Sequence, residues 1–288
     1  MMMPARRSSS MLSTNDCQDE GWQAVLKLRL QKIDGRTCLL PLQRIGPLTV
    51  QRPFYPEGEV CHVYVLHPPG GVVGGDQLKL DIDVRPGAQG LITTPGAGKF
   101  YRSAGKTAGL QQKFNVYGNA ALEFLPLENI YFPAAEVSSK ILVNLDKDAK
   151  FVGWEIHCFG LPANGEDFTA GKVLLNTELK VDGKLLLHDR LKIDFLEQAR
   201  LCGLQGSRVY GSFVIYSQAI NKSLLELLQS QKAESGIAGV SRVESELIVV
   251  RYLGNSTEHA LNYFRKLWAI SRPRALGLEA CKPRIWDT

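Results

Sequence analysis

Residues 78–84, Leu-Lys-Leu-Asp-Ile-Asp-Val, alternate without a break between apolar and charged side chains. Successive side chains of an extended chain point to opposite faces, so this pattern predicts a strand with one buried and one solvated face. The same alternation recurs at residues 26–31, 110–116, 141–145 and 173–181. We therefore expect a fold dominated by β-strands.

Turn-forming residues separate the alternating segments. Asp34-Gly35 and Asp182-Gly183 are hairpin dipeptides in which glycine supplies a positive φ. Up to about residue 216 no helical period of ten or more residues interrupts the strands. This argues against alternating βαβ units and a parallel Rossmann sheet.

Two helices are expected late in the chain. The leucine-rich residues 224–228 follow Asn221, and an apolar stripe at residues 261–268 follows the cap-like residues 255–258. Between them, residues 247–253 are apolar and β-branched, which predicts a buried strand. Because no linker divides the chain, we expect a flexible polar tail at residues 1–20 and a single domain at residues 21–288.

Composition excludes several classes of protein. The 288 residues include 34 Lys and Arg against 29 Asp and Glu, a net charge of only +5. The basic residues do not cluster with regularly spaced aromatics, so no nucleic-acid partner is expected. No window approaches 18 uninterrupted apolar residues, so no membrane span is expected. The six scattered cysteines and the lack of an apolar leader favour a reducing, cytoplasmic setting.

The glycine-rich residues 67–76, His-Pro-Pro-Gly-Gly-Val-Val-Gly-Gly-Asp, form the densest local motif. They resemble a phosphate loop but lack its lysine, and a strand rather than a helix follows. A bound nucleotide is therefore not expected, and any GTP or ATP would be hydrolysed by a partner. The glycines either allow close packing between β layers or contact a partner.

The five histidines and six cysteines show no spacing typical of a structural metal site. The carboxylates are more informative. Asp189 lies on the same parity as Leu185, Leu187, Leu191 and Ile193, which places it on the apolar face of its strand. A carboxylate in that position must be paired, hydrogen-bonded or directed into a wet cavity. Asp189 is thus either a partner of a nearby Arg or Lys, or a polar station inside a channel.

Three further carboxylates are candidates. Asp76 ends the glycine-rich motif and either caps a turn or lines a path, and Glu166 follows the turn-forming Asn164-Gly165. Glu155 lies in residues 151–159, where both faces are too apolar to assign its direction. Two of these acids on a β scaffold could also form the acid/base pair of a β-helix carbohydrate-active enzyme.

Five stretches together identify a family. They are residues 46–56 (GPLTVQRPFYP), 67–76 (HPPGGVVGGD), 91–103 (LITTPGAGKFYRS), 122–126 (LEFLP) and 283–286 (PRIW). On these residues the chain, from about residue 22 to its end, resembles the UreD family of urease accessory proteins, called UreH in some systems. One departure is Leu161, where family members carry arginine.

The resemblance implies a non-enzymatic role in urease maturation by nickel incorporation. Such proteins bind the urease apoprotein together with a UreF-type protein and, through the complex, a UreG-type GTPase. The implied fold is an elongated β-helix-like stack of strands with two α-helices in the C-terminal third. An internal tunnel is proposed to conduct nickel, which implies a transient nickel ion and no tightly bound cofactor.

Weak, repeated oxygen ligands suit such a path, because an ion must both enter and leave. We expect Asp76 and Asp189 to line it, with Glu155 and Glu166 as further candidates.

Four other residues are candidate partner contacts: Tyr101, Arg102, Arg272 and Trp286.

Overall fold

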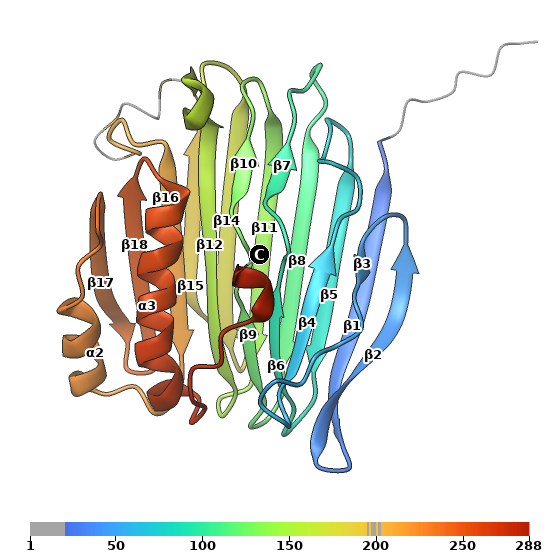
Figure 1. Ribbon diagram of the computed structural model, residues 1–288, viewed down its shortest axis with the longest axis vertical. Helices are drawn as coiled ribbons and strands as arrows, with labels where there is room; N and C mark the ends of the chain where they lie inside the picture. Colours follow the sequence, from blue (N-terminus) through green and yellow to red (C-terminus); the bar gives the residue numbers. More distant parts are fainter. Residues whose placement is uncertain (1–20, 195, 197–199, 201–202, 288) are drawn as a thin grey trace, which may run out of the picture.

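The structure is a computed structural model that describes residues 21–194, 196, 200 and 203–287. The predicted polar tail at residues 1–20 lies outside the described residues. Within the described part, the strands form two large sheets (Figure 1).

Sheet I has seven strands among the described residues. From edge to edge they are β15 (Lys184–Ile193), β14 (Lys172–Val181), β11 (Glu136–Leu145), β8 (Ala108–Val116), β5 (Gln77–Val84), β1 (Gln23–Ile33) and β2 (Arg36–Ile45).

Sheet II has eleven strands among the described residues. The main path is β17 (Ile237–Glu244), β18 (Leu247–Gly254), β16 (Val209–Tyr216), β12 (Lys150–Leu161), β9 (Ala121–Phe124), β6 (Gln89–Thr93), β4 (Cys61–Leu66) and β3 (Thr49–Val50). Three short strands join it at the side: β7 (Gly98–Phe100), β10 (Asn129–Tyr131) and β13 (Glu166–Asp167).

The chain winds as a β-solenoid, alternating between the two sheets. Neighbours β1, β5, β8, β11 and β14 of sheet I run parallel, as do β4, β6, β9 and β12 of sheet II. Antiparallel hairpins or meanders complete both sheets, with β2 and β15 at the edges of sheet I and β16 to β18 on sheet II. The predicted β-helix-like stack of strands is confirmed.

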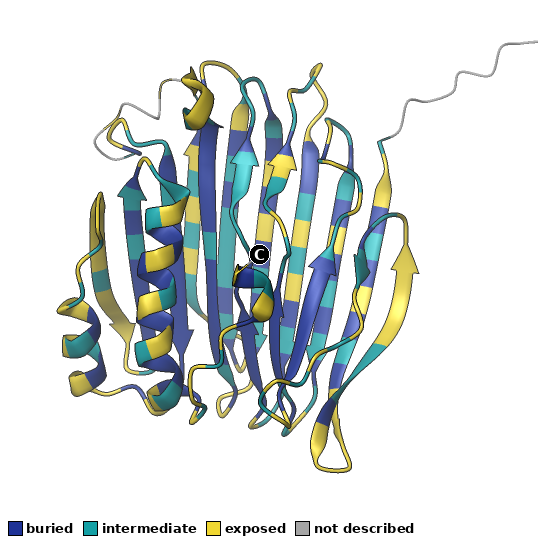
Figure 2. Cartoon of the chain, viewed as in Figure 1, coloured by how far each residue is buried: buried dark blue, intermediate teal, exposed yellow. Residues whose placement is uncertain are grey.

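The burial of each strand explains its sequence pattern. The strands of sheet I alternate because one face meets sheet II and the other meets solvent (Figure 2). The strands β4, β9 and β18 of sheet II are buried almost throughout. They are apolar on both faces because sheet I covers one face and helix and C-terminal segments cover much of the other.

Both predicted helices are present and begin at the predicted caps. Helix α2 (Lys222–Gln229) starts after Asn221, whose side chain accepts the Leu224 N–H, and α3 (Thr257–Ala275) starts after Ser256, which accepts the His259 N–H. Helix α3 covers the outer face of β12 and β16 (Figure 1). No helix in the described ranges is long and apolar enough to cross a membrane.

The two predicted hairpin turns are also confirmed. Asp34 and Gly35 connect β1 to β2, and Asp182 and Gly183 connect β14 to β15. All four residues have positive φ, between 46° and 86°, as the turn that matches strand twist requires.

The glycine-rich loop owes its composition to close packing. A Cβ added at Gly71 would overlap the Tyr101 ring and lie 2.9 Å from the Lys99 carbonyl oxygen, and one at Gly74 would lie 2.7 Å from the Lys106 carbonyl oxygen. Tyr101 also donates a hydrogen bond to the Gly70 carbonyl at 3.0 Å. The glycines thus let this loop lie directly on the segment around residues 99–106.

Replacing Gly71 by alanine is expected to destabilise the protein by about 1–3 kcal/mol, because the added methyl group cannot fit without moving backbone. The free energy of unfolding from a denaturant titration measures this. Gly239→Ala is the matched control, since a Cβ there meets nothing within 4 Å. Equal stability of the two variants would contradict this account of the loop.

Candidate functional site

The strands of sheet II are interrupted at one position along their length, and a chamber lies at the interruption. Residues 94–97 separate β6 from β7, and residues 125–128 separate β9 from β10. Side chains satisfy the backbone groups left free there: Thr93 donates to the Leu125 carbonyl, Thr94 accepts the Leu127 N–H, and Trp154 donates to the Pro126 carbonyl. The break is therefore a stable feature of the fold.

The chamber has a volume of about 260 Å³. Loop residues 67–71 and 94–97 and strand β7 line it on one side, and β5 and β8 of sheet I line it on the other. Most of its wall is apolar. Its polar lining side chains are His67, Thr94, Lys99, Gln112, Asn129 and Glu155.

Glu155 lies at the inner end of the chamber, on the face of β12 directed toward sheet I. Its Oε2 accepts a hydrogen bond of 3.1 Å from the Thr177 hydroxyl on β14. Burial raises the pKa of Glu155 to about 7, and the nearby Asp189 adds to the rise while Thr177 and Arg251 oppose it. The Glu155 side chain thus exchanges its proton near neutral pH.

His157 lies two residues further along β12, on the same face. Its Nε2 is 3.6 Å from Glu155 Oε1, and its Nδ1 is 3.0 Å from the Tyr131 hydroxyl oxygen. Burial lowers the pKa of His157 to about 3, so the ring is neutral. A neutral imidazole beside a carboxylate offers a second donor atom to a cation.

Asp189 occupies the inner face of β15, as its parity predicts. A bulge leaves Leu186 without a partner and turns Leu185 outward, so the inward series begins at Leu187. Asp189 Oδ2 is 2.6 Å from an Arg251 guanidinium nitrogen and accepts a 3.0 Å hydrogen bond from Tyr210. The predicted pairing with an arginine is therefore observed, and Asp189 also faces the space between the sheets, whereas its role as a polar station in a channel stays a prediction.

Strand pairing places five polar residues at one position along the strands, which we call the polar level: Glu155, Thr177, Asp189, Ser212 and Arg251. On sheet II, Glu155 pairs with Ser212 and Ser212 with Arg251. On sheet I, Thr177 pairs with Asp189. The adjoining pairs of sheet I are leucines: 179 with 187 on one side, 175 with 191 on the other. The polar level therefore crosses an otherwise apolar part of the interior.

Two small cavities adjoin Glu155, which also lines the chamber. One of about 20 Å³ is bounded by Glu155, Thr177 and Ser212, and one of about 10 Å³ by Glu155, Asp189 and Tyr210. All three spaces share Glu155 as a wall. Together their linings run from the glycine-rich loop to the partly exposed Asp189, which retains 30% of its side-chain surface.

The other two predicted path residues lie elsewhere. Asp76 is buried, and its two carboxylate oxygens accept the backbone N–H groups of Trp22 (2.8 Å) and Val73 (3.0 Å), so it locks the glycine-rich loop. Glu166 is exposed on β13. Neither lines the cavities described above.

The candidate partner contacts divide into two pairs. Arg102 is exposed, and Tyr101 is half-buried with its ring against Phe132. Arg272 and Trp286 are both buried, contrary to the surface position expected for them. Trp286, in the C-terminal segment, packs against Trp154 and Trp268.

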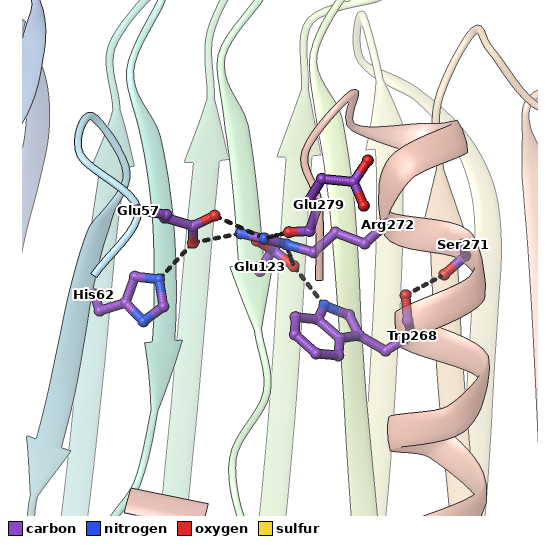
Figure 3. Close-up of polar contacts among 7 residues, drawn as sticks. All are labelled: Glu57, His62, Glu123, Trp268, Ser271, Arg272 and Glu279. Atoms are coloured by element: carbon purple, nitrogen blue, oxygen red, sulfur yellow. Dashed lines mark hydrogen bonds and ion pairs between the residues drawn. The ribbon is translucent and has the colours of Figure 1, made fainter. Parts of the chain in front are cut away.

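Arg272 is buried because it joins α3 to sheet II and to the loop before β4. Its guanidinium contacts both oxygens of Glu57 (2.7 and 2.8 Å) and Glu123 (2.9 to 3.1 Å), and it donates to the Glu279 carbonyl (Figure 3). His62 binds Glu57 at 2.6 Å. Burial raises the pKa of Glu123, whereas His62 and Arg272 outweigh burial and lower that of Glu57. The hydrogen bonds of the Arg272 guanidinium described here are thus all made to groups of this chain.

Several residues of the site had escaped sequence reasoning. Arg251 is a charged residue inside an apolar, buried strand, which is the same signal that marked Asp189. Tyr210 and Thr177 carry no such signal, because tyrosine and threonine are ordinary strand residues. His67 is part of the glycine-rich motif; its Nε2 is buried with no hydrogen-bond partner among the described residues, and burial lowers its pKa.

Within the described ranges, no three His, Cys, Asp or Glu side chains lie close enough to hold a metal ion together. The polar level therefore provides separate one- or two-ligand contacts. Such contacts suit passage of a cation better than storage.

Replacing Arg272 by alanine is expected to destabilise the protein by about 3–5 kcal/mol, because the substitution strands two buried carboxylates without their counter-charge. Thermal unfolding monitored by circular dichroism measures the loss. Arg274→Ala is the control, since Arg274 is exposed on the same helical turn. A melting temperature of Arg272→Ala close to that of the control would refute the structural role assigned to Arg272.

Glu155→Gln is expected to have a pH-dependent effect on stability. Between its ordinary pKa of 4.5 and about 7, the folded chain holds the Glu155 proton more tightly than the unfolded chain, so stability falls as pH rises through this window. Glutamine does not titrate, so the variant does not lose stability over this pH range. The variant should be more stable than wild type at pH 8, by up to about 3 kcal/mol, and nearly equal at pH 5. Unfolding at the two pH values tests this, and equal destabilisation at both would contradict it.

Comparison with known proteins assigns the chain to a family. The family model described as UreD urease accessory protein matches residues 23–287. A urease accessory protein UreD of Aliivibrio fischeri is 42% identical over 279 residues, covering 93% of this chain and 97% of the relative. Proteins of the same name from Pseudomonas putida (41% identical, 94% and 96% covered) and an Azoarcus species (39% identical, 93% and 95% covered) also match. The chain belongs to the UreD family of urease accessory proteins.

Proposed function

We propose that this chain assists the maturation of urease by conducting Ni²⁺ through the chamber and along the polar level. Members of its family are accessory proteins and not enzymes. The proposed partners are the urease apoprotein, a UreF-type protein and, through the complex, a UreG-type GTPase, all in the cytoplasm. Nickel is cargo in this account, not a resident cofactor.

One observation carries the proposal: a row of polar side chains crosses the interior of the β-solenoid from the chamber to the surface. Buried polar groups cost free energy unless they are satisfied, so an interior built for stability alone favours apolar residues at such positions. Here Glu155 is held between two sheets with a raised pKa, and Asp189 follows it toward solvent. This arrangement supports transport more readily than packing.

The ligand chemistry fits a passing divalent cation. Carboxylate and hydroxyl oxygens hold Ni²⁺ loosely, and a single imidazole binds it more strongly. The neutral rings of His67 in the chamber wall and His157 beside Glu155 offer such nitrogens. Because these groups are spread along the path, each holds the ion weakly enough for it to leave.

The path that we propose uses only some of the candidate residues. Glu155 and Asp189 are its central residues, and His67, Thr177 and Tyr210 join them. Asp76 supports it indirectly by fixing the glycine-rich loop at the chamber wall. Glu166 lies outside the proposed path.

We also propose that the surface around Tyr101 and Arg102 contacts a partner. Tyr101 packs on the glycine-rich loop that lines the chamber, and the next residue, Arg102, is exposed. A partner bound there would be well placed to exchange nickel with the chamber.

The carbohydrate-active alternative finds no support. Family membership places the chain among accessory proteins. In addition, Glu155 and Asp189 face a space between the sheets of about 10 Å³, which is far too small for a sugar ring.

Glu155→Gln and Asp189→Asn are each expected to lower nickel-dependent urease activation by about ten-fold while the accessory complex still assembles. The measurement is urease activity after co-expression with apo-urease and the other accessory proteins, with complex formation followed by pull-down. Glu166→Gln is the matched control, since this carboxylate is exposed and off the path. Full activation by both path variants would disprove the proposed path, and loss of complex assembly would instead give these residues a structural role.

A further inference from the structure

The polar level is closed at its outer end. The space among Glu155, Asp189 and Tyr210 is about 10 Å³, roughly enough for a single water molecule. A divalent cation with any of its hydration shell needs more room. Passage therefore requires a side chain at this end to move.

Arg251 is the side chain best placed to move. Its guanidinium lies 2.6 Å from Asp189 and donates to the Ser212 hydroxyl at 2.9 Å. Its side chain is 33% exposed, so it has solvent to swing into. Tyr210 and Thr177 also hydrogen-bond the two carboxylates, but a rigid ring and a short side chain can swing less far than the long arginine stem.

The contact between Arg251 and Asp189 is also weak enough to break. Ion pairs that remain partly in solvent contribute little to stability, because water screens them in either state. A cation that binds the Asp189 carboxylate must displace the guanidinium, and the two therefore compete for the same oxygens. This competition lowers the affinity of the site for every cation.

We propose that Arg251 is a gate that keeps every cation weakly bound at Asp189, so that an ion can leave this end of the path; the proposal rests on the nickel path proposed above. Each cation must displace the guanidinium before it binds the carboxylate, so the same cost is subtracted from the binding free energy of every cation. Ni²⁺ binds oxygen and imidazole ligands more tightly than Mn²⁺ does, and the hard cation Mg²⁺ prefers to keep its water. Arg251 thus keeps the occupancy of Asp189 by the weaker-binding cations low and also prevents Ni²⁺ from being held tightly.

The direct test is Mn²⁺ binding to the full-length chain, measured from the electron paramagnetic resonance signal of free Mn²⁺. Arg251→Gln is expected to bind Mn²⁺ at least about five-fold more tightly than wild type. Adding Asp189→Asn to that variant should abolish the gain, because the carboxylate is what the arginine masks. Arg208→Gln is the control, since Arg208 pairs with the exposed Asp167 outside the polar level.

Arg251→Lys provides a second, milder variant that keeps the charge and a flexible stem. Lysine lacks the guanidinium fork, so Mn²⁺ affinity should fall between those of wild type and Arg251→Gln. Melting curves confirm that each variant is folded. Wild-type Mn²⁺ affinity in either folded variant would overturn the gate.

A competition assay extends the test to function. In urease activation with Ni²⁺ held well below the concentration that saturates the path, MnCl₂ should inhibit the Arg251→Gln complex at concentrations at least about five-fold lower than it inhibits wild type. Equal inhibition would overturn the gate and leave the path intact, provided that Glu155→Gln and Asp189→Asn reduce activation. Normal activation by those two carboxylate variants would overturn the path itself.

Discussion

The Glu155 carboxylate, held between two β-sheets, is the constraint around which the rest of the site is arranged. Burial raises its pKa to about 7, so keeping it there costs stability at neutral pH. Thr177 supplies a hydrogen bond from the opposite sheet, and Ser212 and Arg251 continue the polar level on its own sheet. An apolar residue would pack better at this position, so the glutamate calls for a functional explanation.

The chamber beside Glu155 requires that sheet II be broken without collapsing. Threonine and tryptophan side chains satisfy the backbone at the break, and Trp286 also donates to the Thr93 hydroxyl. The network around Arg272 holds α3 and the loop before β4 against the outside of the same sheet. The residues that cover the outer face of sheet II and those that line the interior therefore both support the chamber.

The sequence predicted the fold well because each part rests on local chemistry. Alternation, Asp-Gly turns and the caps Asn221 and Ser256 act within a few residues of one another, and all three appear as expected. Asp189 could be placed on an inner face by parity alone, although the bulge at Leu186 shifted the pattern around it.

The site was less predictable because it depends on pairs far apart in the chain. Arg272 meets Glu57 and Glu123 across 215 and 149 residues, so no local pattern could show that it is buried. Glu155 lies in a strand segment that is apolar on both faces. The segment is apolar because both faces of the strand are covered in the fold, which local sequence does not show. The carboxylate of Asp76 has the chemistry of a metal ligand, but in the structure it accepts two backbone hydrogen bonds. Only these hydrogen bonds distinguish a structural role from a ligand role.

The most direct test of the central claim is an anomalous difference map at the nickel absorption edge, from crystals of the full-length chain soaked in NiCl₂. The account predicts density between Glu155 and Asp189, near Thr177, with oxygen-rich coordination and partial occupancy. Density at surface side chains alone, with the space between the two carboxylates empty at every nickel concentration, would contradict it.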